Sequence, residues 1–389
     1  MRMGKLSKRI EQLSESQTIA MARMSRELKE KGVDVISLSL GEPDFGTPEI
    51  IGDSAKKAID EGFTHYPPIA GYADLKEAIS QKFSEENNLS FSPDQIVVST
   101  GAKQSIANVI LSLIDPGDEV IVPIPYWVSY TQLITLAEGR SVFIPSNVDS
   151  DYKITPTQLK EAITPKSRLM IFSSPCNPSG SVYTKEELHE FARVLADHPD
   201  IIILSDEIYE HINFGGKHES IAQFSEVSDR VVVVNGVSKA YAMTGWRIGY
   251  MGAPLWIAKA CNKMQGQFTS AANSIAQKAT ITALREASKY REEMKETFLK
   301  RRELMLGLLR DIPGMKTNTP QGAFYIFPDI SAYFGRSHNG KTMNNSAELC
   351  MYLLTEGHVG LVPGEAFGEP NCLRISYAAS DDELRTAVD

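Results

Sequence analysis

Two ionisable residues stand just after apolar runs, where such side chains are uncommon. Asp206 follows the run at 201–204, and Lys239 follows the run at 231–234. If these runs are buried strands, burial opposes the charged form of both side chains. An uncharged lysine could form a Schiff base with an aldehyde, and an ionised aspartate could pair with a protonated ring nitrogen. The simpler alternatives are a helix N-cap for Asp206 and a lysine that extends to solvent for Lys239.

A glycine turn and an arginine offer the features of a phosphate site. Gly101 precedes the amphipathic stretch 103–113, which is typical of a helix. The backbone N–H groups of residues 101–103 would then face a ligand together with the positive end of the helix dipole. The guanidinium of Arg247 would complete the cradle and is a candidate for the cation that lowers the pKa of Lys239. A plain tight turn at Gly101 is nearly as good an interpretation of that segment alone.

Alternating strands and helices would bring these residues together. Apolar runs predict strands at 95–99, 119–123, 169–173, 201–205, 231–235 and 248–251, with helices at 103–113, 185–196 and 254–264. This pattern predicts an α/β fold with a doubly wound, mostly parallel sheet and helices on both faces. Ligands bind such sheets beyond the carboxyl ends of the strands. The polar clusters at 100–103, 175–178, 206–209 and 236–239 should therefore converge on one crevice.

The chain length predicts more than one domain. At 389 residues the chain exceeds what one ordinary core accommodates. We expect an N-terminal segment, residues 1–45, that packs on a smaller domain, and a large domain at 46–285. A smaller α+β domain at 286–389 would open with a long charged helix at 287–309 and contain strands at 323–327 and 373–377.

Composition argues against several classes of partner. The net charge of -9 comes without a basic stripe, so nucleic acid is not an expected partner. No apolar stretch approaches the roughly 18 residues that span a bilayer, and the first residues lack the apolar centre of a secretory signal. We expect no membrane association and a cytoplasmic location. The 4 cysteines are scattered without paired spacing, which predicts neither a disulfide framework nor a metal site.

The residues around Lys239 resemble the lysine signature of the class I aminotransferases. The matching segment is SKAYAMTGWRIG at 238–249. Further matches, in the same chain order, are LGEPDF at 40–45, YPP at 66–68, GAKQ at 101–104, YWVSY at 126–130, NPSG at 177–180, SDEIY at 205–209 and LRIS at 373–376. The resemblance implies the fold-type I architecture, pyridoxal phosphate as cofactor, and a homodimer with active sites at the subunit interface.

The resemblance also implies a role for each residue around the cofactor ring. Lys239 would form the Schiff base and move a proton between the substrate Cα and the cofactor. Asp206 would keep the ring nitrogen protonated, which makes the ring an electron sink. Asn177 and Tyr209 would hydrogen-bond the phenolic oxygen, and Trp127 would stack on the ring. Without the motif, Trp127 would be read as ordinary core packing.

The resemblance also implies which residues bind the cofactor phosphate and which bind the substrate α-carboxylate. The implied phosphate ligands are Gly101, Ala102, Lys103, Arg247 and Tyr66 of the partner subunit, with a hydroxyl from Ser238 or Ser270. Arg374 would bind the α-carboxylate as a bidentate fork, with Gly41 closing over it. The chain departs from the family pattern at Cys176, Ser179 and Gly236. At Gly236 distant relatives supply a phosphate-binding serine, so that contact would be missing or come from Ser238.

A second carboxylate on the substrate would need its own cation. In the aspartate aminotransferase subgroup that this sequence most resembles, a lysine at the place of Lys103 meets the distal carboxylate, helped by N-terminal Ser and Thr. Ser16 and Thr18 fit that pattern. Aspartate is the expected amino donor, with glutamate and prephenate left open. The simpler interpretation of Lys103 is a first-turn helix residue that faces solvent.

Other functions fit the sequence less well. Residues 335–342 match the P-loop expression, but no buried strand leads into them and no helix follows directly. No G-x-G-x-x-G follows the first strand, which argues against a nicotinamide-dependent oxidoreductase. A lyase or synthase on the same cofactor stays open as the alternative, because it would share Lys239, Asp206 and Arg247. A regulator that binds the cofactor would need a DNA-binding module, for which the N-terminal forty residues are too few.

Overall fold

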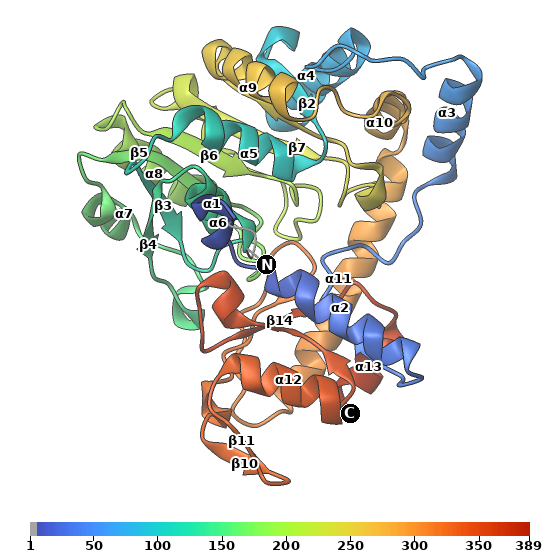
Figure 1. The fold of residues 1–389 in the computed structure, drawn as a ribbon, viewed down its shortest axis with the longest axis vertical. Helices are drawn as coiled ribbons and strands as arrows, with labels where there is room; N and C mark the ends of the chain where they lie inside the picture. Colours follow the sequence, from blue (N-terminus) through green and yellow to red (C-terminus); the bar gives the residue numbers. More distant parts are fainter. Residues whose placement is uncertain (1–5) are drawn as a thin grey trace, which may run out of the picture.

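A seven-stranded sheet forms the centre of the molecule (Figure 1). The computed structural model describes residues 6–389. The strand order is β2-β8-β7-β6-β5-β3-β4, and only β8 runs antiparallel to its neighbours. The strands are β2 (Ile96–Ser99), β3 (Glu119–Pro123), β4 (Arg140–Ile144), β5 (Ser167–Ser173), β6 (Ile202–Asp206), β7 (Val231–Gly236) and β8 (Gly249–Gly252). The predicted mostly parallel sheet is confirmed.

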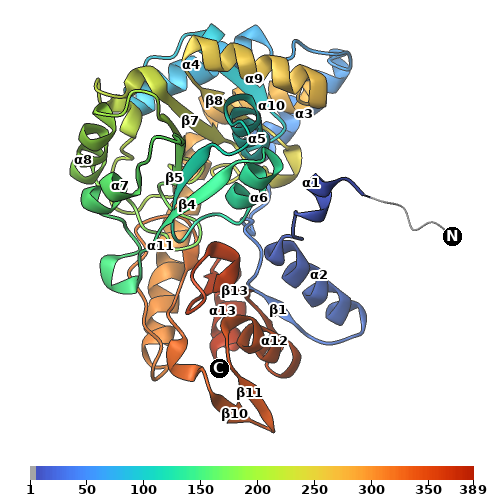
Figure 2. The same ribbon diagram turned by 60° about the vertical axis from the view of Figure 1, so that its left-hand side comes forward.

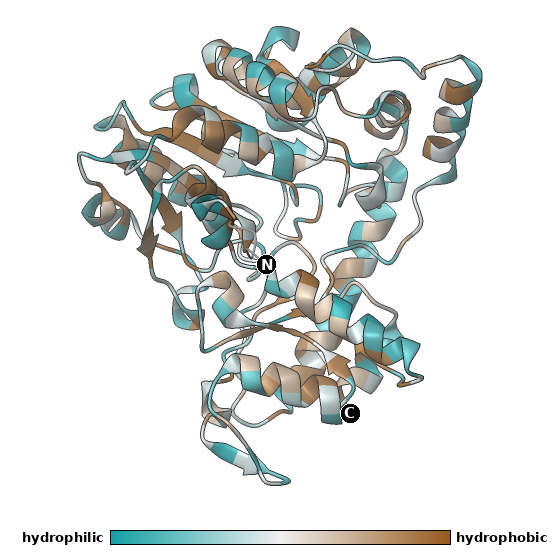
Figure 3. Ribbon diagram, in the orientation of Figure 1, coloured by the Kyte–Doolittle hydropathy of each residue, from teal (hydrophilic) through white to brown (hydrophobic). Residues whose placement is uncertain are grey.

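Helices cover both faces of this sheet because its strands are apolar on both sides, as their brown colour in Figure 3 shows. Ile202 and Leu204 pack toward one face, and Ile203 between them packs toward the other. One face carries α5 (Ala102–Leu113), α6 (Ser129–Leu136) and α9 (Leu255–Phe268). The other carries α3 (Glu49–Asp60), α4 (Ala73–Asn87), α7 (Pro156–Ala162), α8 (Lys185–Ala196) and α10 (Ser274–Glu286). The doubly wound α/β class follows directly from this alternation.

A second core lies below the large sheet and joins the two ends of the chain (Figures 1 and 2). Its main sheet has the order β13-β14-β9, from Val362–Pro363, Leu373–Ser376 and Tyr325–Ile326. The helices around it are α2 (Gln17–Glu30), α11 (Ser288–Arg310), α12 (Ser346–Glu356) and α13 (Asp381–Val388). β1 (Ile36–Ser37) pairs in parallel with β12 (Val359–Gly360), which ties the N-terminal segment to this core. The boundaries at residues 45 and 285 stay a prediction.

Several sequence expectations can be compared directly with these elements. The helix at 185–196 was predicted with its bounds, and Thr184 caps it by accepting a hydrogen bond from the backbone N–H of Glu187. The edge strand β4 was missed because it is partly exposed and carries Arg140 and Ser141 within a short apolar run. A short helix, α1 (Lys8–Glu11), precedes α2. Among residues 6–389, no helix is long and apolar enough to cross a membrane.

The segment that matches the P-loop expression forms a hairpin at the surface. Strands β10 (Arg336–His338) and β11 (Lys341–Met343) pair antiparallel and are largely exposed. A phosphate-binding P-loop needs a buried strand that leads directly into a helix N-terminus. The match in sequence letters therefore carries no nucleotide site.

Candidate active site

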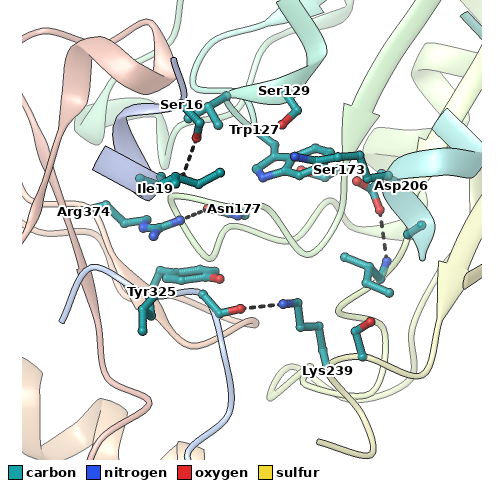
Figure 4. Close-up of a pocket in the computed structure, with 18 of the residues that line it drawn as sticks. Ser16, Ile19, Trp127, Ser129, Ser173, Asn177, Asp206, Lys239, Tyr325 and Arg374 are labelled. Carbon is teal, nitrogen blue, oxygen red and sulfur yellow. Dashed lines mark hydrogen bonds between the residues drawn. The ribbon is translucent and has the colours of Figure 1, made fainter. Parts of the chain in front are cut away.

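The predicted site residues gather around one cavity of about 380 Å³ (Figure 4). The cavity lies at the carboxyl ends of β5 and β6, where Ser173 and Asp206 are the last strand residues. The predicted residues that line it are Ser16, Thr18, Gly41, Ala102, Lys103, Trp127, Asn177, Asp206, Tyr209, Ser238, Lys239, Arg247 and Arg374. Segments separated by more than three hundred residues in sequence therefore meet here.

Asp206 is a buried carboxylate with few partners. It is 5% exposed and accepts hydrogen bonds from the Tyr130 hydroxyl (2.7 Å) and the backbone N–H of Ile208 (3.3 Å). Burial raises the pKa of Asp206 to about 6, although these two hydrogen bonds act in the opposite direction. A turn, not an α-helix, follows it, so the N-cap alternative is wrong. A carboxylate held this way would gain most from a cation in the cavity.

Lys239 lies three residues after β7 and points into the cavity, not to solvent. Its Nζ donates a hydrogen bond to the carbonyl oxygen of Gly41. The pKa of Lys239 is lowered to about 8, mainly by burial; Arg374 and Arg247 act in the same direction, and Glu42 opposes them. The sequence pointed to Arg247 as the neighbouring cation, and the structure adds Arg374. Roughly a tenth of this amine is then uncharged at pH 7, far more than for an ordinary lysine, and the uncharged form is the one that attacks an aldehyde.

The glycine turn before α5 is shaped for a small anion. Gly101 has φ +83°, and a Cβ there would lie 2.3 Å from Nη2 of Arg247. Contrary to expectation, the N–H of Gly101 donates to the carbonyl oxygen of Ser99 (2.8 Å) and is not free for a ligand. Within the described chain, the N–H groups of Ala102 and Lys103 have no protein acceptor. Gly101 thus supplies space, while the next two residues supply donors.

Arg374 forms the floor of the cavity near Asn177. The arginine is 2% exposed; its Nη1 donates to Oδ1 of Asn177 (2.9 Å) and its Nη2 to the carbonyl oxygen of Ser39 (2.6 Å). Its guanidinium lies over the ring of Tyr325, 4.5 Å from the centroid. Among residues 6–389, Nε of Arg374 has no hydrogen-bond partner. A buried cation with an unused donor is suited to a carboxylate ligand.

The mouth of the cavity carries the residues predicted to read a distal charge. The hydroxyls of Ser16 and Thr18 form a hydrogen bond of 2.8 Å. Nζ of Lys103 lies 5.0 Å from the ring centroid of Trp127. Lys103 is an exposed residue in the first turn of α5, and its pKa is lowered by desolvation and then by Arg247. Arg26 of α2 also lines the cavity and was not predicted.

Two expected phosphate ligands are not near the cavity in this chain. Tyr66 is 95% exposed and does not line it. Ser270 also lies outside the lining, at φ +63°.

The sequence did not predict the residues that hydrogen-bond to the predicted site residues from outside the cofactor space. Tyr130 binds Asp206, and Tyr325 binds Tyr209. Behind the 206–210 turn, Glu207 accepts hydrogen bonds from the hydroxyls of Ser205 and Ser220 and from His218, and Glu210 contacts Lys82, Asn87 and His211. Only the acidic pattern of residues 206–210 hinted at this network, since its partners come from distant segments.

Comparison with known proteins places this geometry in a family. Residues 33–389 match the model described as "Aminotransferase class I and II". The chain is 46% identical to the "Bifunctional aspartate aminotransferase and glutamate/aspartate-prephenate aminotransferase" of Petunia hybrida, covering 99% of this chain and 81% of that one. It is 45% identical to the "Aspartate/prephenate aminotransferase" of Nitrosomonas europaea, covering 99% and 98%.

Solved structures agree with these sequence relatives. The crystal structure of the aspartate aminotransferase from Rhizobium meliloti matches with a TM-score of 0.95 at 40% identity, covering 99% of this chain and 97% of that one. The Thermus thermophilus aspartate aminotransferase with maleate matches with a TM-score of 0.93 at 38% identity, covering 99% and 98%. The chain therefore belongs to the class I and II aminotransferases.

Proposed function

We propose that this chain holds pyridoxal phosphate on Lys239 and moves the amino group of aspartate to a 2-oxo acid such as 2-oxoglutarate. The observation that carries the proposal is that Lys239, Asp206 and Arg374 share one cavity. The same cavity thus offers an amine with a depressed pKa, an anion for a ring cation and a fork for a carboxylate. The names of the relatives favour aspartate, with glutamate and prephenate as further substrates.

The residues present fit this cofactor. The space left by Gly101 beside Arg247, with the free N–H groups of Ala102 and Lys103, suits a phosphate. Asp206 suits a protonated pyridine nitrogen, and Trp127 lines the cavity where a ring could stack. Asn177 and Tyr209 line the same cavity as candidates for the phenolic oxygen, and Ser238 offers a hydroxyl. When bound, pyridoxal phosphate supplies an electron sink for the bond that breaks at the substrate Cα.

The chain's own residues would then orient the substrate and carry its proton. Arg374 would bind the α-carboxylate through its unused Nε and its Nη groups, while Asn177 keeps the guanidinium in place. Gly41 lines the same cavity as Arg374, so the segment that bears Gly41 would close over the bound carboxylate. Once the substrate amine has displaced it from the cofactor, the Lys239 amine would take the proton from the substrate Cα and deliver it to the C4′ atom of the cofactor. Asp206 would stay ionised opposite the ring nitrogen.

A dicarboxylic substrate is supported by the far end of the cavity. Lys103, Ser16 and Thr18 line the same cavity as Arg374 and present a cation and two hydroxyls to it. The matched Thermus thermophilus structure is described as containing maleate, which is a dicarboxylate. Arg26 provides a second cation at the same end.

A homodimer with shared sites is part of the proposal. Tyr66 is 95% exposed in the single chain and is therefore accessible to a second subunit. We infer that Tyr66 of one subunit reaches the phosphate of the other.

A half-reaction spectrum tests the proposed function. Purified protein loaded with pyridoxal phosphate is mixed with single amino acids, and the visible band of the bound aldehyde is followed. Aspartate should convert that band to the ultraviolet band of the amine form, with the matching 2-oxo acid released in equal amount. A lyase or synthase would leave the aldehyde band in place while consuming the amino acid, which would contradict the proposal.

A further inference from the structure

Two buried tyrosines meet beside the space proposed for the cofactor ring. Tyr209 comes from the turn after β6, whereas Tyr325 comes from β9 in the three-stranded sheet. Their hydroxyl oxygens lie 2.6 Å apart, and Tyr209 is 3% exposed and Tyr325 0%. Among residues 6–389, each hydroxyl has the other as its only hydrogen-bond partner. Figure 4 shows Tyr325 between Arg374 and Lys239.

The neighbouring cation decides which tyrosine donates. The Arg374 guanidinium lies 4.5 Å from the ring centroid of Tyr325. Burial raises the pKa of both hydroxyls, and Arg374 lowers the pKa of both, but its guanidinium lies directly over the ring of Tyr325. A cation over the ring makes a phenol more acidic and a better donor, so we assign the donation to Tyr325 and the accepting role to Tyr209. Each phenol has one proton, and that of Tyr209 is then left for an acceptor in the cavity.

We propose that Tyr325 is a positioning residue that, by donating to Tyr209, aims the Tyr209 proton at the phenolic oxygen of the cofactor. This inference rests on the proposed function. Accepting one hydrogen bond also strengthens the bond that Tyr209 donates, because chains of hydrogen bonds polarise one another. Since Tyr325 also touches Arg374, it connects the carboxylate end of the cavity with the ring.

Tyr325→Phe should weaken this donation while it keeps the ring against Arg374. The phenolic oxygen would then carry more negative charge, and the nitrogen that joins the cofactor to Lys239 would become more basic. The pH midpoint of the visible absorption band should rise by about 0.5 to 1 pH unit, as the loss of one neutral hydrogen bond implies. The KM for the amino acid should stay near the wild-type value because Arg374 and Asn177 still meet.

A spectroscopic pH titration of the loaded enzyme tests the inference. Tyr377→Phe is the matched control, since Tyr377 is 0% exposed in the same core and its hydroxyl donates to the carbonyl oxygen of Ala323 (3.0 Å). The control should keep the wild-type midpoint. Tyr325→Phe with an unchanged midpoint, or an equal shift in the control, would overturn the inference.

The double variant separates action through Tyr209 from any other route. Tyr209→Phe should raise the midpoint more than Tyr325→Phe does, and adding Tyr325→Phe to it should change nothing further. Additive shifts would show that Tyr325 acts elsewhere and would overturn the inference. If the wild-type chain shows no visible band with pyridoxal phosphate, the proposed function itself fails. A wild-type band without the variant shift rejects only the role of Tyr325.

Discussion

At the scale of single residues, the site depends on opposite shifts of two buried groups. Lys239 has its pKa lowered to about 8, and Asp206 has its pKa raised to about 6, in both cases mainly by burial. Both shifts reduce the charge inside the cavity. A protonated ring nitrogen would reverse the cost for Asp206, because it provides the missing opposite charge.

Removal of the Asp206 charge should stabilise the cofactor-free protein in a pH-dependent way. The folded-state pKa of about 6 exceeds the unfolded value of 3.8, so burial of the charged form costs stability above pH 6 and less as the pH falls. Asp206→Asn should gain up to about 3 kcal/mol in the free energy of unfolding at pH 7.5, and much less at pH 4.5. Urea unfolding of both apo-proteins at the two pH values measures this.

The same variant should lose turnover with the cofactor. We expect roughly a 10²- to 10³-fold fall in kcat, since a neutral amide cannot keep the ring nitrogen protonated. A gain in stability that is equal at both pH values would contradict the assigned titration of Asp206.

Lys103 should contribute to substrate choice and little to the rate with apolar substrates. Lys103→Ser should raise the KM for aspartate by roughly 10- to 100-fold, because a charge-assisted hydrogen bond to the distal carboxylate is lost. The KM for phenylalanine should change by less than about 3-fold. Steady-state kinetics with both substrates measure the difference, and Lys103→Arg is the control that keeps the charge. An equal change for both substrates would show that Lys103 does not read the distal charge.

At the scale of elements, the phosphate end is produced by the junction of β2 and α5. The strand ends at Ser99, whose carbonyl accepts from the N–H of Gly101, and the helix begins at Ala102. This arrangement leaves the N–H groups of Ala102 and Lys103 without an acceptor in the described chain, next to Arg247. Gly101 is required because its φ is +83° and because Arg247 occupies the place of a Cβ.

Gly101→Ala should therefore weaken phosphate binding specifically. We expect the Kd for pyridoxal phosphate to rise at least about 10-fold, as about 1.4 kcal/mol of lost contacts implies. Gly117→Ala is the matched control, with φ +91° but nothing within 4 Å of the added Cβ, so it shares only the backbone strain. Absorbance titrations with pyridoxal phosphate and with phosphate-free pyridoxal measure both effects. Equal losses for the two ligands would show general damage to the site.

At the scale of the whole molecule, the cavity is built where two cores meet. Arg374 and Tyr325 come from the C-terminal core, Ser16 and Thr18 from the N-terminal segment, and Asp206 and Lys239 from the large sheet. Arg301 of α11 fastens the 40–45 segment through two hydrogen bonds to Asp44 (2.7 and 2.8 Å). The segment that bears Gly41 is thereby held against the C-terminal core.

Mixed dimers should show whether Tyr66 acts across the subunit interface. The Lys239→Ala variant should lose covalent cofactor attachment and nearly all turnover. The Tyr66→Ala variant should have low activity at limiting pyridoxal phosphate. A hybrid dimer of the two, purified through different tags, would contain one site with Lys239 from one chain and Tyr66 from the other. Its activity at limiting cofactor should approach half that of the wild type. Activity at half that of Tyr66→Ala would place Tyr66 in its own subunit's site.

The sequence by itself predicted the strands of the large sheet other than β4, and many of the residues that line the cavity. This was possible because an apolar run defines a buried strand, and the residues after its carboxyl end, such as Asp206 and Lys239, must then lie at the ligand edge. Motif resemblance added Arg374, which no local pattern would have linked to Asn177 across 197 positions.

Only the tertiary structure decided the contacts between distant segments. The bond from Tyr130 to Asp206, the pair of Tyr209 and Tyr325, and the entry of Arg26 all depend on how separate elements dock. The N–H of Gly101 was misassigned because its direction depends on the φ and ψ angles of the turn, which the residue types leave open. Contacts between side chains that are far apart in the sequence depend on how whole helices and strands pack against one another. A pattern of residues within one segment therefore cannot predict them.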